Sequence, residues 1–263
     1  MAGNDGILIS LWSKRMQPLV RDNIRLAATV MLIRDTPVGL EVYMVKRPGR
    51  GDFPDLHVFP GGKVDEDDFA PKLCEGMEDT QASKLMGIEA GGLRYWLAVA
   101  RECFEECGVL IVHENGDDLS PAGVGKMSDW RTALLADSIS FTGLCRQQGL
   151  TIACTRLGYF SHWITPDMAP RRFDTRFFIA AMPSAQTALA DTGETAGEHW
   201  VRPSRALELG GSNEWKMIDP TVLSLQTLSQ YNTVEEALTG VNSGNHLMPL
   251  TPELNRQGMQ VLR

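Results

Sequence analysis

The sequence predicts an α/β fold, because strand-like and helix-like segments alternate along its 263 residues. Residues 24–34 contain a long apolar run and are expected to form a buried strand, and residues 41–47 alternate in the period of two that strands show. Residues 93–107 repeat apolar side chains at the i, i+3, i+4, i+7 spacing of one helix face. These segments predict a sheet with at least one amphipathic helix packed on it.

The first two strands are expected to pair as a hairpin. Residues 35–39, Asp-Thr-Pro-Val-Gly, have the composition of a turn between them. Residues 69–92 are acidic and carry scattered glycines, so loops with one short helix near residues 80–85 are expected there. This segment either shapes the entrance of a site or is a surface excursion.

The remaining elements follow from the same signals. Gly108 is expected to end the helix of residues 93–107. After it we expect a strand at 109–112, a polar loop at 116–125, a helix capped by Ser128 and a helix ending at Gly149. Three strands follow: one at 157–164, one entered through Arg171 and Arg172, and a last one beginning at Trp200. Helices are expected at 203–209, 219–231 and 234–238.

Three glutamates on the helix of residues 93–107 are placed unfavourably for an ordinary solvated face. Glu102, Glu105 and Glu106 share one side of the helix, nearly opposite the apolar stripe. Glu102 and Glu106 repel each other, and Glu105 and Glu106 lie in the last turn, where the helix dipole disfavours anions by about 0.3–1 kcal/mol each. A bound divalent cation reverses both costs, because Mg²⁺ and Mn²⁺ prefer carboxylate oxygens. The alternative is an acidic surface patch.

The residues before and after this helix turn extend the pattern. His57 to Asp65 reads His-Val-Phe-Pro-Gly-Gly-Lys-Val-Asp, and Arg101 to Val109 reads Arg-Glu-Cys-Phe-Glu-Glu-Cys-Gly-Val. The two stretches resemble the two halves of the Nudix box, with Gly62 as its first glycine. Asp68 stands where the family usually has Glu, and the spacer of residues 69–100 is far longer than the seven residues of the usual pattern. Such an interrupted box is similar to the Nudix branch that includes coenzyme A diphosphatases.

The resemblance implies a fold and a metal site. The implied fold is a Nudix α/β/α sandwich with a mixed sheet between helices, an insertion within the box and a C-terminal helical extension. Glu102, Glu105 and Glu106 are the implied ligands of Mg²⁺ or Mn²⁺. Arg101 would orient a glutamate through a charge-assisted hydrogen bond, and the absence of side chains at Gly61 and Gly62 lets the backbone approach metal or phosphate.

The same resemblance suggests residues outside the box. Arg47, at the end of the hairpin, is the expected phosphate contact, unless it is simply solvated. Arg171 and Arg172 are also candidates for phosphate binding, because the arginine fork donates bidentately; the alternative is a structural pair with an aspartate. The expected general base is Glu102 or a loop carboxylate, for which Glu194 is the first candidate and Glu198 the second. His199 is more simply interpreted as structural.

The implied activity is divalent-metal-dependent hydrolysis of a diphosphate bond in a nucleoside diphosphate linked to another moiety. Coenzyme A or an acyl-coenzyme A is the first expected substrate, and ADP-ribose, NADH and nucleotide sugars follow. Two other functions stay open. One is a non-catalytic nucleotide-binding Nudix module, which would usually have lost a box carboxylate. The other is a metal-dependent isomerase on the same fold, which would need catalytic groups outside the box.

The composition and length of the chain limit which partners and which domain organisation are expected. The content of 43% hydrophobic and 22% charged residues is that of a globular protein, and a net charge of −8 argues against nucleic-acid binding. The longest apolar runs are too short for a membrane span, and the five scattered cysteines suit a reducing compartment. Neither terminus carries a recognisable targeting signal, so a cytoplasmic location is expected. We expect a Nudix domain over residues 20–210 (box 61–109, insertion about 69–92), a helical extension over 211–263, and allow a homodimer.

Overall fold

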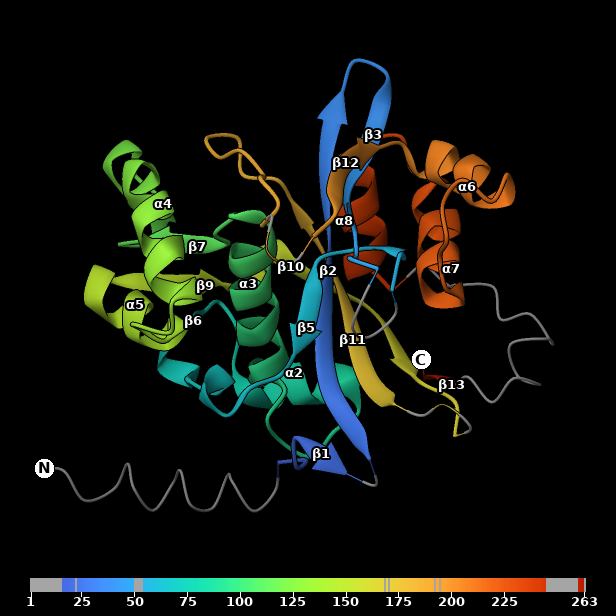
Figure 1. Ribbon diagram of the computed structural model, residues 1–263. Helices are drawn as coiled ribbons and strands as arrows, with labels where there is room; N and C mark the ends of the chain where they lie inside the picture. The colour runs from blue at the N-terminus through green and yellow to red at the C-terminus, as the bar shows by residue number, and fades with distance from the viewer. Residues whose placement is uncertain are drawn as a thin grey trace, which may run out of the picture.

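The chain is described by a computed structural model that covers residues 16–21, 23–49, 54–167, 169, 171–191, 193 and 195–244, with the backbone of 260–262. Its centre is a mixed sheet, shown in Figure 1. The strands of this sheet are β1 (Val20–Arg21), β2 (Ile24–Thr36), β3 (Gly39–Lys46), β4 (His57–Val58), β5 (Gly61–Lys63), β10 (Leu157–Ile164), β11 (Arg172–Ala181), β12 (Gly197–Val201) and β13 (Gln260–Leu262). The strand order is β12-β3-β2-β11-β10-β13, with β1, β4 and β5 paired onto it.

Strand β2 organises the sheet. On one side it pairs in parallel with β11 along Ile24 to Ile33, the parallel pairing of this sheet. On its other side it pairs antiparallel with three strands in turn: β1 over residues 24–25, β5 over residues 27–29 and β3 over residues 33–36. The strand therefore exchanges partners midway along its length. The glycines of β5 are held beside the first half of β2 by this exchange.

Helices cover both faces of the sheet, as the sequence predicts. One face carries α2 (Asp79–Met86), α3 (Leu93–Cys107), α4 (Pro121–Leu135) and α5 (Phe141–Gln148), and the other carries α6 (Pro203–Gly211), α7 (Asp219–Leu228) and α8 (Val234–Asn242) (Figure 1). A smaller sheet of β6 (Cys74–Glu75), β9 (Leu150–Ala153), β7 (Val112–Glu114) and β8 (Asp117–Asp118) lies among the first group. The predicted helix–sheet–helix sandwich is confirmed.

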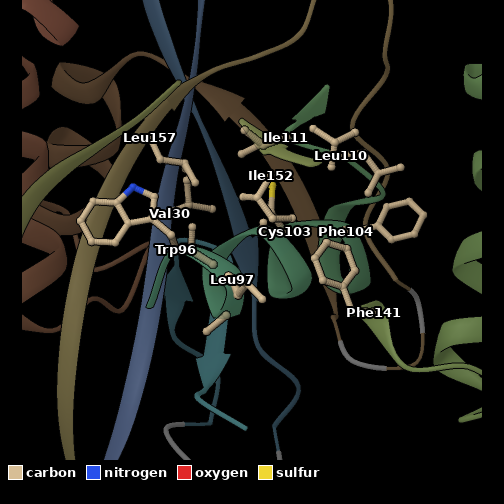
Figure 2. Close-up of a cluster of buried hydrophobic side chains, with 14 of the residues drawn as sticks. Val30, Trp96, Leu97, Cys103, Phe104, Leu110, Ile111, Phe141, Ile152 and Leu157 are labelled. Atoms are coloured by element: carbon tan, nitrogen blue, oxygen red, sulfur yellow. The ribbon is translucent and has the colours of Figure 1, made fainter. Parts of the chain in front are cut away.

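The core lies in two clusters, one on each face of the sheet. Around α3, the large side chains Trp96 and Phe104 are fully buried and pack with Val30, Leu110 and Phe141, as Figure 2 shows. Every residue of α3 except Glu105 is buried. The helix is therefore enclosed on nearly all sides, not solvated on the face opposite its apolar stripe.

The second cluster joins the sheet to the C-terminal helices. Leu225 and Leu228 of α7 are fully buried, and they belong to the same cluster as Met31 of β2 and Ile179 of β11. The helices after residue 210 thus pack on the sheet and share its core. The part of the chain that the structure describes contains no helix long and apolar enough to cross a membrane.

Most predicted elements are present, and several boundaries differ, among them the end of α7 at Leu228 and that of α8 at Asn242. The hairpin, the short helix of the insertion, α3 and α5 are confirmed. The strand predicted at 109–112 is β7, which begins only at Val112. The predicted cap Ser128 is wrong: it lies inside α4, whose N-cap is Ser120, with Pro121 following and the Gly123 amide donating to the Ser120 hydroxyl. β12 begins at Gly197, before the predicted Trp200.

Candidate functional site

A pocket of about 550 Å³ lies where β2, β5, β11, α3 and the start of α7 meet. Gly61, Gly62, Glu102 and Glu106 contribute to its wall, and so does Arg47 from the end of the hairpin. The two halves of the interrupted box therefore come together in space, although an insertion separates them in sequence. A site of this size accommodates a small-molecule ligand.

The glycines of β5 make room for the glutamates of α3. A Cβ atom added at Gly62 would lie 2.4 Å from the Glu102 Oε1 atom, which no side chain could accommodate without displacing that carboxylate. At Gly61 the added atom would lie 2.4 Å from the Ala28 carbonyl oxygen. The Gly61 amide donates a hydrogen bond of 2.8 Å to Glu106 Oε2. Both glycines are thus required by the close packing of β5 between β2 and α3.

Arg101 connects the box carboxylates. Its guanidinium donates to both oxygens of Asp68, at 3.0 and 2.9 Å, and to the Lys63 carbonyl at 2.8 Å. It also donates to Glu102 at 2.9 Å and to Glu105 at 2.7 Å. The bidentate bond with buried Asp68 fixes the plane of the guanidinium, so this arginine can hold Glu102 and Glu105 in defined positions. The orienting contact expected of Arg101 is present, and it extends to Asp68.

Burial makes the glutamates unfavourable as isolated anions. Desolvation, opposed by Arg101 and reinforced by the neighbouring Glu106 and Glu105, raises the pKa of Glu102 to about 8. Burial likewise raises the pKa of Glu105 against the influence of Arg101. A carboxylate that is buried beside other carboxylates gains most from a nearby cation. The burial of the glutamates therefore supports the inference from the sequence that this cluster binds a divalent cation.

The side chains fit a metal only in part. Glu102 and Glu106 face the pocket, while Glu105 is turned to Arg101 and does not contribute to the pocket wall. Among the described residues, no three His, Cys, Asp or Glu side chains are grouped to hold a metal. Mg²⁺, however, commonly keeps several waters and uses one or two carboxylates together with substrate phosphates. The chemistry of Glu102 and Glu106 fits such an ion, and the role of Glu105 as a ligand stays a prediction.

The end of α3 is neutralised by groups that the sequence argument did not identify. Arg131 of α4 donates two hydrogen bonds to the Glu105 carbonyl, at 3.1 and 2.8 Å. The amides of Leu189 and Asp191 donate to the carbonyls of Cys107 and Glu106. These donors satisfy the last-turn carbonyls of α3 and place a cation at the negative end of its dipole. Pairing across 26 residues of sequence leaves no local signal that could have revealed Arg131.

The predicted phosphate-binding arginines separate into two groups. Arg47 contributes to the pocket wall, and so does Lys63, which was not predicted from the sequence. Arg171 and Arg172 do not contribute to the wall. Arg172 instead donates to the Thr165 carbonyl and forms an ion pair with Asp167. Arg172 therefore makes the kind of Arg–Asp pair that the structural alternative describes, and phosphate binding by Arg171 or Arg172 stays a prediction.

The loop carboxylates are not brought to the pocket within the described residues. Glu198 accepts hydrogen bonds from the Tyr43 hydroxyl and the Ala190 amide, away from the pocket wall. His199 packs beside His57 and Trp215 in an aromatic cluster, which agrees with a structural role. Glu194, the first candidate for proton acceptor, lies outside the described residues.

Comparison with known proteins places these features in a family. A family model described as the NUDT19 Nudix domain matches residues 91–228, which include α3 and end with α7. The acyl-coenzyme A diphosphatases NUDT19 of Xenopus laevis and Homo sapiens are each 26% identical to the chain, over 233 and 235 residues. These matches cover 74% and 75% of the chain, but 61% and 63% of those proteins. The chain therefore spans about three fifths of their length.

Two further relatives support the comparison. Putative nudix hydrolase 7 of Caenorhabditis elegans is 29% identical over 235 residues, covering 89% of this chain and 69% of that protein. The crystal structure of a NUDIX hydrolase from Alicyclobacillus acidocaldarius superposes with a TM-score of 0.64 at 24% identity, covering 84% of this chain and 97% of that one. The structural similarity shows that the fold is shared.

Proposed function

We propose a function that proceeds from one premise: the chain belongs to the Nudix hydrolases, in the family of the NUDT19 Nudix domain. Nudix hydrolases generally use divalent metal ions. On this premise the chain is a Mg²⁺- or Mn²⁺-dependent hydrolase of a diphosphate bond in a nucleoside diphosphate linked to another moiety. The observation that carries the proposal is the meeting of Glu102, Glu106, Gly61 and Gly62 in one pocket.

Each residue of the pocket has a role in this proposal. Glu102 and Glu106 hold the cation, which when bound polarises the diphosphate and lowers the pKa of the attacking water. Arg101 positions Glu102 through its hydrogen bond of 2.9 Å. Arg47 and Lys63 lie on the same wall, where they bind phosphate oxygens and offset the charge of the substrate. Glu105 acts through Arg101 or as a third ligand.

The proton acceptor is Glu102 or Glu194. Glu102 lies at the pocket, within reach of a water bound there. Glu194 follows from the family resemblance alone. A pH profile of kcat/KM for Glu194→Gln separates the two, since loss of the acceptor removes the limb of the profile on which activity rises with pH.

Coenzyme A or an acyl-coenzyme A is the first proposed substrate. The printed names of the NUDT19 relatives, acyl-coenzyme A diphosphatase, support this choice. Because the chain spans about three fifths of those proteins, ADP-ribose, NADH and nucleotide sugars remain in the comparison. The protein would then act on a small-molecule diphosphate in the cytoplasm.

The test is hydrolysis of a panel of diphosphates with Mg²⁺ or Mn²⁺. We expect cleavage of coenzyme A thioesters at the diphosphate, and Glu106→Gln should lower kcat/KM by a factor on the order of 100 to 1,000, because metal binding contributes several kcal/mol to the transition state. Glu235→Gln, an exposed change on α8, is the matched control. Full turnover by Glu106→Gln would overturn the metal assignment. Binding without any product would instead indicate a nucleotide-binding module, and a rearranged product an isomerase.

A further inference from the structure

The pocket has two chemically different halves. Glycine backbone, two glutamates, Arg47 and Lys63 make the charged half described above. Much of the remaining lining is apolar, and its residues come from β10, from β11 and from the start of α7: Trp163, Ile164, Phe173, Phe177, Ile218 and Pro220. One continuous pocket therefore joins a phosphate-binding surface to an apolar wall.

Two polar side chains of β10 and its following loop, Trp163 and Thr165, are already engaged in hydrogen bonds. The Trp163 indole donates to the Ser161 hydroxyl at 3.0 Å, so the ring presents apolar surface to the pocket. The Thr165 hydroxyl accepts from the Phe173 amide at 3.0 Å and donates to the Phe173 carbonyl. These bonds fix the backbone that carries Phe173. A sugar placed here would find these polar groups occupied by one another.

The α7 side of the wall is held in place from two directions. Ile218 is the N-cap of α7, and its carbonyl accepts from the amides of Thr221 and Val222. Fully buried Leu225 and Leu228 anchor the helix in the core of the sheet. Before the helix, the Lys216 carbonyl accepts from the His57 amide at 2.8 Å, which ties the segment to β4. The wall is thus a fixed part of the site.

We propose that Ile218 and Pro220 form a specificity wall for the unbranched apolar acyl chain that the substrate carries on its pantetheine arm. This inference rests on the proposed function and goes beyond it, because it assigns substrate choice to a segment outside the Nudix box. A second nucleoside or a sugar would lose water from its hydroxyls without gaining hydrogen bonds from the side chains of Ile218 and Pro220. An alkyl chain has no such loss, and each buried methylene strengthens binding by about fourfold.

The test compares coenzyme A with its acetyl, octanoyl and palmitoyl thioesters. In the wild type, kcat/KM should rise with chain length. Ile218→Asn should lower kcat/KM for the palmitoyl thioester by about tenfold or more while changing that for coenzyme A by less than about twofold, because one polar group removes several methylene contacts. Ile218→Leu should keep the chain-length dependence. Gln226→Ala, exposed on the same helix, is the control.

Two outcomes would overturn the inference: an equal loss for all four substrates, which would place the nucleotide against this wall, or an unchanged chain-length dependence in Ile218→Asn. Circular dichroism checks folding, and Ile218→Thr replaces the asparagine variant if that variant unfolds. If the wild type hydrolyses none of the four compounds but cleaves another diphosphate of the panel, the coenzyme A assignment fails; if it cleaves no diphosphate at all, the proposed function fails. Calorimetric Kd values for the same series and variants then test the wall by itself, with the same chain-length dependence expected.

Discussion

At the scale of single residues, the site depends on how closely backbone and carboxylate approach each other. Glu102 is buried against Gly62 on one side and bonded to Arg101 on the other. Asp68, bonded to both ends of the Arg101 guanidinium, is as necessary to this arrangement as the glutamates themselves. The aspartate at this position is shorter than the glutamate of the usual pattern, yet it reaches the arginine with both oxygens.

Gly62→Ala tests this close approach. The added methyl would lie 2.4 Å from Glu102 Oε1, and because it meets the end of a flexible side chain, the carboxylate should move while the fold persists. A displacement of this kind is expected to lower kcat/KM by a factor on the order of 100. Thermal unfolding should change little. Gly125→Ala, where nothing lies within 4 Å, is the control, and equal activity of the two variants would contradict the role of Gly62.

His57 should make stability depend on pH. Its ring is buried and stacks on Trp215 with centroids 4.2 Å apart, and burial, with the charges of His199 and Lys46, lowers its pKa to about 4. In the unfolded chain the pKa of this histidine is near 6.5. Between pH 4 and pH 6.5 the unfolded state therefore binds more protons than the folded state. The stability that the folded protein gains from keeping His57 neutral is therefore fully present above pH 6.5 and is lost as the pH falls toward 4.

The measurement is urea unfolding at pH 7.5 and pH 4.5 for the wild type and His57→Phe. The wild type should lose about 2 kcal/mol more than the variant on acidification, because a shift of one pKa unit corresponds to 1.36 kcal/mol. Taking the difference between the two proteins cancels the titration of the carboxylates that they share. Parallel losses in the two proteins would show that His57 is readily protonated in the folded state.

At the scale of elements, α3 is held at both ends by other parts of the chain. Its own N-cap, Gly92, has no side chain, and Asp79 of α2 takes over by accepting from the amides of Gly91 and Leu93. Arg131 neutralises the opposite end. The insertion that interrupts the box therefore supplies the cap for the helix that carries the second half of the box. It has a structural function beyond that of a surface excursion.

Asp79→Ala should destabilise the fold more than the loss of an ordinary cap. A cap is worth about 1 kcal/mol, and leaving buried amides unpaired adds about 1–3 kcal/mol. We expect a total loss of about 2–4 kcal/mol in the free energy of unfolding, measured by urea denaturation. Lys84→Ala, exposed on the same helix, should change it by less than about 0.5 kcal/mol. A loss as small as that for Asp79→Ala would show that α3 does not depend on α2.

The sequence predicts elements well where their signals are local, and it misses contacts between distant segments. The limits of α3 follow from its apolar period and from Gly108, whose φ of 68° ends the helix. The start of α4 was missed because Ser120 and Pro121 stand in a glycine-containing stretch that reads as a loop. Nothing near α3 in sequence indicates Arg131 or Asp79. Their pairing with α3 depends on how the helices pack.

At the scale of the whole molecule, the site is assembled from most of the chain. The box glutamates and glycines were identified from the sequence, and the pocket brings them together. The ion pair of Arg172 with Asp167 could not be predicted from the sequence, because the partner of an arginine depends on its position in the fold. Ile218 and Pro220 fall after the boundary expected at residue 210, yet they line the pocket. The C-terminal helices share the core of the sheet and contribute to the site.

The central claim is that Glu102 and Glu106 hold a divalent cation against a diphosphate. The most direct test is a Mn²⁺ titration, followed by electron paramagnetic resonance, with ADP present to supply phosphate oxygens. Wild-type protein should bind Mn²⁺, and the double variant Glu102→Gln, Glu106→Gln should bind it at least tenfold more weakly while remaining folded. Equal Mn²⁺ affinity in the two proteins would contradict the account.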